Sequence, residues 1–168
     1  MIRLSIVRLF GPLVLMTGAA FAQIPAPFSE SLNAAAVAAG SLNFYIGRMA
    51  RDCQPILKEP QSFIQDTVSF WQKNNGVYVR AAAVYLGSLT EHLEKTKGKE
   101  FATAVQREAI MAVRTSGTKL VSDFTNKHGI KEACTRFRSL VRSNAYDITS
   151  AHPLYSDLKE LVRFTSQN

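Results

Sequence analysis

Few residues in this chain are of the types that do covalent or metal chemistry. The cysteines are Cys53 and Cys134, and the histidines are His92, His128 and His152. Two cysteines exclude a four-cysteine zinc or iron–sulfur site, and they do not form a C-x-x-C pair. The histidine spacing lacks a ligand signature such as H-E-x-x-H. His92 and His152 are therefore only weak candidates for metal binding, and we expect no cofactor.

The sequence also lacks the usual signs of hydrolytic or nucleotide chemistry. It contains no G-x-S-x-G elbow, no Ser/His/Asp pattern and no glycine-rich phosphate loop. Carboxylates such as Glu108 and Asp123 are several turns apart on what we expect to be a charged helix surface. That arrangement is typical of a solvated face. We therefore expect a protein that acts by binding and is not an enzyme.

A basic cluster is the better candidate for a functional surface. Between positions 127 and 142 the chain has five basic residues and one acidic residue, Glu132. Helical spacing predicts that Lys131, Arg138 and Arg142 share one outer face. Such a face suits docking of an acidic protein partner or of an anionic envelope surface. The alternative interpretation is an ordinary solvated helix face.

The N-terminal segment, residues 1–22, has the three parts of a secretory signal peptide. Arg3 and Arg8 make a basic start, an apolar stretch follows, and residues 20–22 (Ala-Phe-Ala) form a small-x-small cleavage site. The uncharged stretch over 9–22 is shorter than the roughly 18 residues that a spanning helix needs. The leader predicts export, and its form suggests a bacterial periplasm or the cell exterior.

Removing the leader changes the charge of the chain. The mature protein would begin at Gln23, and losing Arg3 and Arg8 leaves 18 basic side chains against 13 acidic ones, so the net charge falls from +7 to +5. An exported protein of this charge is not expected to meet nucleic acid. The mature chain has no continuous apolar stretch long enough for a transmembrane segment.

Apolar periodicity predicts two long helices in the first half of the mature chain. The first helix starts near Ser31 and ends at Pro55, and the second runs from Pro60 to Lys95. Residues 73–76 (Lys-Asn-Asn-Gly) interrupt the second with a turn-like tetrapeptide, so two short helices are an alternative. We prefer one long helix, because the apolar phase continues across the tetrapeptide. The first apolar seam is Leu32, Ala35, Ala39, Leu42, Ile46, Met49 and Cys53.

Three further helices are expected. The third spans residues 100–127 and is stopped by Gly129, the fourth spans 130–148, and a short closing helix starts at Pro153. We expect six apolar residues of the third helix to face inward: Phe101, Val105, Ala109, Ala112, Leu120 and Phe124.

The two cysteines connect these helices into one architecture. In an up-down-up-down bundle, the end of the first helix and the start of the fourth lie at the same end, as Cys53 and Cys134 do. Cysteine pairs in exported proteins usually form disulfides. We therefore predict an all-α, disulfide-linked bundle of four main helices plus a short C-terminal helix. Its domains are a signal peptide (1–22), a flexible lead-in (23–30) and one helical domain (31–168).

The predicted function is binding of a protein partner, as an inhibitor, immunity-type protein, adaptor or chaperone. The alternative is a metal- or ligand-binding carrier, for which the bundle would bring His92 and His152 to one end. An enzyme without a recognisable motif comes third. Phe70, Trp71 and Tyr78 form an aromatic group that could contribute to binding or to a homo-oligomer, although Trp71 and Tyr78 continue the inward seam.

Overall fold

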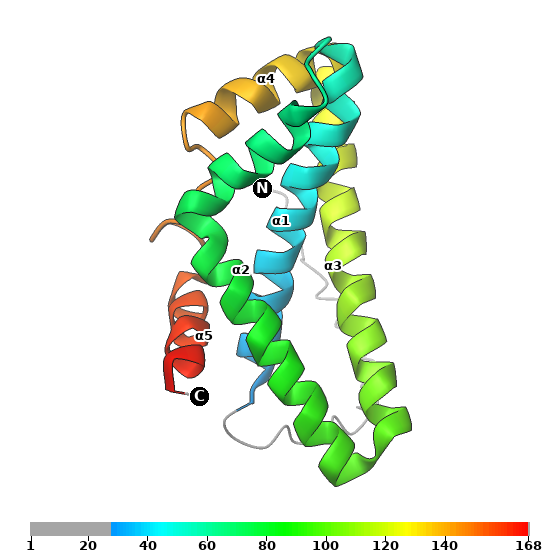
Figure 1. The fold of residues 1–168 in the computed structure, drawn as a ribbon, viewed down its shortest axis with the longest axis vertical. Coiled ribbons are helices and arrows are strands. Elements are labelled where there is room, and N and C mark those ends of the chain that lie inside the picture. The colour runs from blue at the N-terminus through cyan, green and yellow to red at the C-terminus, as the bar shows by residue number, and fades with distance from the viewer. Residues whose placement is uncertain (1–27, 168) are drawn as a thin grey trace, which may run out of the picture.

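The computed structural model describes residues 28–167, and within them the chain forms five α-helices and no strand (Figure 1). The long helices α1, α2 and α3 make up the body of the fold, α4 crosses it near one end, and α5 lies against α1 and α2. The signal peptide expected over 1–22 falls outside the described residues. The helices are α1 Glu30–Ile56, α2 Ser62–Lys97, α3 Lys99–His128, α4 Ile130–Arg142 and α5 Tyr155–Gln167.

The expected all-α bundle with a disulfide is confirmed. In place of one long fourth helix, however, the chain has the two shorter helices α4 and α5. The fourth helix was expected over 130–148 and instead ends at Arg142. Asn144 then adopts a left-handed φ of 59°, a conformation that asparagine tolerates better than most residues. The chain turns through residues 143–154 before α5 begins.

Helix α1 begins where a serine caps it. The Ser29 hydroxyl accepts a hydrogen bond from the Leu32 backbone N–H at 3.2 Å, which satisfies one of the free donors of the first turn. Phe28 is buried just before this cap, with its ring centroid 5.7 Å from that of Tyr85. Of the lead-in expected over 23–30, the structure describes residues 28–30, where Phe28 is part of the core and α1 begins at Glu30.

Helix α2 is continuous through the turn-like tetrapeptide, as expected. Asn75 is only 1% exposed. Its side-chain nitrogen donates to the Trp71 carbonyl and to Asp147, each at 2.8 Å, and its oxygen accepts from the Ile148 backbone N–H at 2.7 Å. The polar residue inside the helix therefore anchors the segment between α4 and α5 and is not part of a turn.

Helix α3 packs through small residues, which corrects its expected inward face. Its buried residues are Ala102 and Gly117, and a Cβ atom on Gly117 would lie 2.5 Å from the Phe44 ring of α1. Glycine at this position permits the close approach of the two helices. Phe101, Ala112 and Leu120 were expected to face inward but are exposed, Phe101 by 45% and Leu120 by 40%, because other small side chains occupy the contact line.

The buried residues form two clusters along the long axis. We call one the α4 core: Tyr45, Ile46, Met49, Ala50, Cys53, Trp71, Cys134, Phe137 and Val141. We call the other the α5 core: Phe28, Leu32, Ala35, Ala36, Ala39, Ala81, Ala82, Tyr85, Leu89, Ile148, Leu158 and Leu161.

Candidate docking surface between α4 and α2

The disulfide fixes α4 to the end of α1. Cys53 and Cys134 are bonded, their Cα atoms are 5.2 Å apart, and both residues are fully buried. The predicted pairing is thus confirmed. The bond lies in the α4 core, and it holds the outer face of α4 in a defined position relative to the first turns of α2 (Figure 1).

Two of the three predicted patch residues come together. Arg138 donates to the Glu59 carboxylate at 2.6 Å and is half-buried. Arg142, one turn later, is exposed and makes no ion pair with a described residue. Lys131 is exposed near the start of α4, two turns before Arg138, which is about 10 Å along a helix. Arg138 and Arg142 therefore share one surface, and Lys131 lies outside the two hollows that they line.

The two arginines border a hollow of about 470 Å³ between α4 and the first turns of α2. Phe63 lies in its wall, and Phe70, at 39% exposed, stands at its edge. The hollow thus joins apolar rings to guanidinium groups, which is a composition that protein partners use for anchoring. Its lining residues are Glu59, Pro60, Phe63, Asp66, Thr67, Phe70, Arg138, Val141 and Arg142.

Four charged side chains line this hollow, and two of them form an ion pair with each other. Glu59 neutralises Arg138 and holds its guanidinium against the end of α1. Arg142 and the Asp66 carboxylate have no charged partner among the described residues. The hollow therefore presents one unpaired positive and one unpaired negative group beside the exposed Phe70 ring.

A second, shallower hollow continues the surface over the outside of α4. It encloses about 450 Å³ and is lined by Arg138 and Arg142 together with hydroxyl-bearing residues. The two arginines consequently form a ridge between the two hollows. The hydroxyl-bearing residues are Thr135, Ser139 and Ser143.

Part of this surface was missed in the sequence because its residues come from distant segments. Glu59 and Arg138 are 79 residues apart, and no local pattern connects them. A local signal did exist on α2, since Phe63, Asp66 and Phe70 recur at helical spacing on the side away from the inward seam.

The aromatic candidates Trp71 and Tyr78 are core residues. Trp71 is 2% exposed and its indole N–H donates to the Tyr146 carbonyl at 3.0 Å. Tyr45 and Tyr146 share a hydrogen bond of 2.8 Å between their hydroxyls, and burial raises the pKa of both phenols above the ordinary value. Tyr78 is half-buried and its ring centroid is 6.5 Å from that of Tyr155. Of the aromatic group, Phe70 alone reaches the docking surface.

The histidine candidates were expected to lie together at one end of the molecule, where they could share a site. In the structure they lie apart. His92 stacks near Phe28, with ring centroids 5.3 Å apart. The His152 ring accepts a hydrogen bond from the Leu154 backbone N–H at 3.1 Å, just before the α5 start, where Tyr155 meets Tyr78. His92 lies about four turns beyond Tyr78 on α2, roughly 21 Å along the helix. Among the described residues, no cluster of three His, Cys, Asp or Glu side chains could hold a metal ion.

No known protein family, curated protein or solved structure matches this chain. None of the helices over residues 28–167 is both long and apolar enough to cross a membrane. The structure itself shows an all-α fold closed by one disulfide, with an arginine- and phenylalanine-lined hollow where α4 meets α2.

Proposed function

We propose that this protein is exported, acts outside the cytoplasm of a bacterial cell, and works by binding a protein partner through the α4–α2 hollow. The inhibitor, immunity-type, adaptor and chaperone roles all use such a surface, and none needs catalysis. The observation that carries the proposal is the placement of Arg138 and Arg142 beside Phe63 and Phe70 around one hollow.

The composition of the hollow supports a protein partner. Arginine and aromatic side chains are over-represented among the residues that dominate binding energy. The free guanidinium of Arg142 suits a carboxylate on the partner, while the Phe70 ring provides apolar area that is exposed in the free protein. The disulfide and the Arg138–Glu59 pair hold this surface in place before binding, which lowers the entropy cost of association.

Export is supported by two features that are independent of each other. Residues 1–22 have the organisation of a secretory leader. The Cys53–Cys134 bond is of a kind that persists in oxidising compartments and is rare in the bacterial cytosol. Fractionation of cells that express the untagged protein would test this part, because recovery with the cytoplasmic fraction would contradict it.

The binding proposal is tested with a pair of charge-reversal variants on the same helix. Arg142→Glu removes the free guanidinium of the hollow, whereas Arg136→Glu makes the same change of charge at a residue that pairs with Glu132 outside both hollows. Wild type and both variants are used to capture partners from envelope extract, and the captured protein is identified by mass spectrometry. Its affinity is then measured at two salt concentrations.

We expect Arg142→Glu to weaken the identified complex by at least about tenfold and to reduce its salt dependence, while Arg136→Glu stays within about twofold of wild type. Phe70→Ala should also weaken binding without changing the salt dependence. Equal loss in Arg142→Glu and Arg136→Glu would indicate a general charge effect. Undiminished binding by Arg142→Glu and Phe70→Ala would refute the proposed surface.

A further inference from the structure

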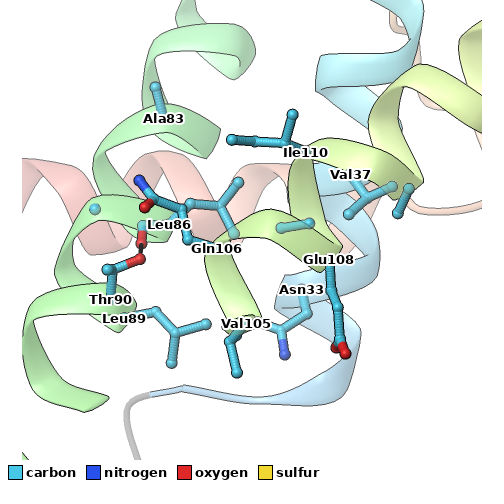
Figure 2. A pocket seen from close by; sticks show the side chains of 13 residues that line it. Asn33, Val37, Ala83, Leu86, Leu89, Thr90, Val105, Gln106, Glu108 and Ile110 are labelled. Atoms are coloured by element: carbon cyan, nitrogen blue, oxygen red, sulfur yellow. Dashed lines mark hydrogen bonds between the residues drawn. The ribbon is translucent and has the colours of Figure 1, made fainter. Parts of the chain in front are cut away.

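A separate hollow, lined by residues of α1, α2 and α3 that differ from those of the α4–α2 hollow, lies between these three helices (Figure 2). It encloses about 410 Å³, which is within the range of small-molecule sites. Its floor comes from α1, where Val37 and Asn33 lie, and its walls come from α2 and α3 (Figure 2). It is partly open to solvent.

The hollow exists because small residues face each other where α2 and α3 stand apart. Ala83 and Gly87 lie on the α2 side, and Ala109 and Ala112 lie on the α3 side. A Cβ atom added to Gly87 would meet no heavy atom within 4 Å. Small residues normally let helices approach closely, but here they leave space that no side chain of the described residues fills.

Apolar side chains form the body of the hollow. Val37 from α1, Leu86 and Leu89 from α2, and Val105 and Ile110 from α3 all line it. Ile110 is 48% exposed, so a ligand could cover apolar area that now faces water. Burying apolar area of this kind is the main source of affinity for small apolar ligands.

Among the described residues that line the hollow, Glu108 is the only one with a charged side chain. The Glu108 carboxylate makes no ion pair with a described residue. Two of the neighbouring polar groups are already engaged: Asn33 accepts from the Tyr85 hydroxyl at 2.8 Å, and the Thr90 hydroxyl donates to the Leu86 carbonyl at 2.8 Å. The electrostatic preference of the hollow is therefore set by Glu108.

We propose that this hollow binds a small amphiphile with an aliphatic body and a protonated amine. The body lies between α2 and α3 over Val37, and the ammonium group pairs with Glu108 at the rim. A fatty acid of equal length is disfavoured, because its carboxylate would face Glu108 without a compensating cation. This inference uses residues separate from the proposed protein-binding surface, so either can fail without the other.

A homologous series of linear alkylamines is the direct test. Binding of hexylamine to dodecylamine to the purified, oxidised protein is measured by calorimetry below the micelle concentration, beside the alcohols and carboxylates of equal length. Affinity should rise about fourfold for each added methylene until the hollow is filled. At each length the amine should bind about two- to fivefold more tightly than the alcohol, and the carboxylate should bind most weakly.

Two variants, compared with one control variant, test the apolar body and the charged rim of the site separately. Gly87→Leu places a side chain into the hollow at a position with free space and a better helix former, so it should abolish binding without loss of stability. Ala104→Leu makes a similar change at an exposed α3 residue outside the hollow and should bind as wild type does. Glu108→Gln should remove the preference for amine over alcohol but keep the dependence on chain length.

Three results would overturn the proposal. The first is that no amine of the series binds. The second is that Gly87→Leu, still folded by circular dichroism, binds as tightly as wild type. The third is that carboxylates bind as well as amines. Loss of partner capture by Arg142→Glu would be unaffected by any of these, so the two proposals are distinguishable.

Discussion

The α4 core and the α5 core are both clusters of buried side chains, but different interactions hold them together. The α4 core contains the disulfide and hydrogen-bonded aromatic residues, with Trp71 bound to the Tyr146 carbonyl and Tyr146 bound to Tyr45. The α5 core contains no disulfide: aliphatic and alanine side chains pack around Tyr85, whose hydroxyl donates to Asn33 at 2.8 Å, and α5 is held by non-covalent contacts such as those of Leu158.

This difference matches the two surfaces that the cores support. The crosslinked core holds the α4–α2 hollow, at which Arg138 and Arg142 are placed. The α5 core adjoins the hollow between α1, α2 and α3.

The largest effect is expected from removing the covalent link. The Cys53→Ala/Cys134→Ala variant loses a bond that closes a separation of 81 residues, which is worth about 4–5 kcal/mol in chain-entropy terms. Urea unfolding of this variant beside the oxidised wild type measures the loss. If the free energy of unfolding falls by less than about 1 kcal/mol, the α4 core does not depend on the disulfide as the comparison requires.

A cavity in the α5 core should cost nearly as much. Leu158 is fully buried, so Leu158→Ala removes a large aliphatic group and is expected to reduce the free energy of unfolding by about 2–5 kcal/mol. Hydrogen exchange should show faster opening of α5 while amides near Cys134 stay protected. The matched control is Leu154→Ala, a partly buried neighbour that should cost less. Equal loss of protection in both cores would show that they open as one unit.

Asn75 joins the two cores and should have an intermediate effect. Its amide bridges Trp71 of the α4 core and Ile148 of the α5 core, so Asn75→Ala leaves the buried Ile148 backbone N–H without its partner. We expect a loss of about 1–3 kcal/mol. Asn74→Ala removes an exposed hydrogen bond to the same carboxylate, that of Asp147, and should cost well under about 1 kcal/mol. Similar losses would argue against the bridge.

Alkaline pH should destabilise both cores by a smaller amount, because burial also raises the pKa of Tyr85 in the α5 core. Burial raises the pKa of Tyr45 and Tyr146 in the folded protein, whereas unfolded tyrosines ionise near pH 10. The folded state therefore retains protons that the unfolded state loses, so stability is complete below about pH 10 and declines as the pH rises above it. Urea midpoints measured from pH 8 to 11 should decline less steeply for Tyr45→Phe/Tyr146→Phe. An unchanged slope would place the titration elsewhere.

The features of this fold that were predicted correctly are those that helical periodicity and the order of the helices determine. The α1 seam, the single helix through Asn75 and the Cys53–Cys134 pairing all follow from periodicity, heptad phase and bundle topology. The α3 inward face could not be obtained in this way, because Gly117 defines the contact line through an absent side chain. The end of α4 was likewise missed, since the left-handed turn at Asn144 has no strong breaker.

The candidate site was predicted only in its α4 half. The periodic spacing of Arg138 and Arg142 is visible in the chain, whereas their α2 and loop neighbours come from a distant earlier segment. Glu59 pairs with Arg138 near the place where the disulfide joins α4 to the end of α1. A contact of that kind depends on tertiary arrangement and leaves no trace in local spacing.

The disulfide also has a mechanical consequence. Tension applied to the two chain ends passes through α1, crosses directly from Cys53 to Cys134, and leaves through α4 and α5, so α2 and α3 sit in a covalent ring that bears no load. A stretched oxidised molecule should therefore hide roughly 270–290 Å of chain, the extended length of the 81-residue separation. That length should appear in a single step when a reductant opens the ring under force.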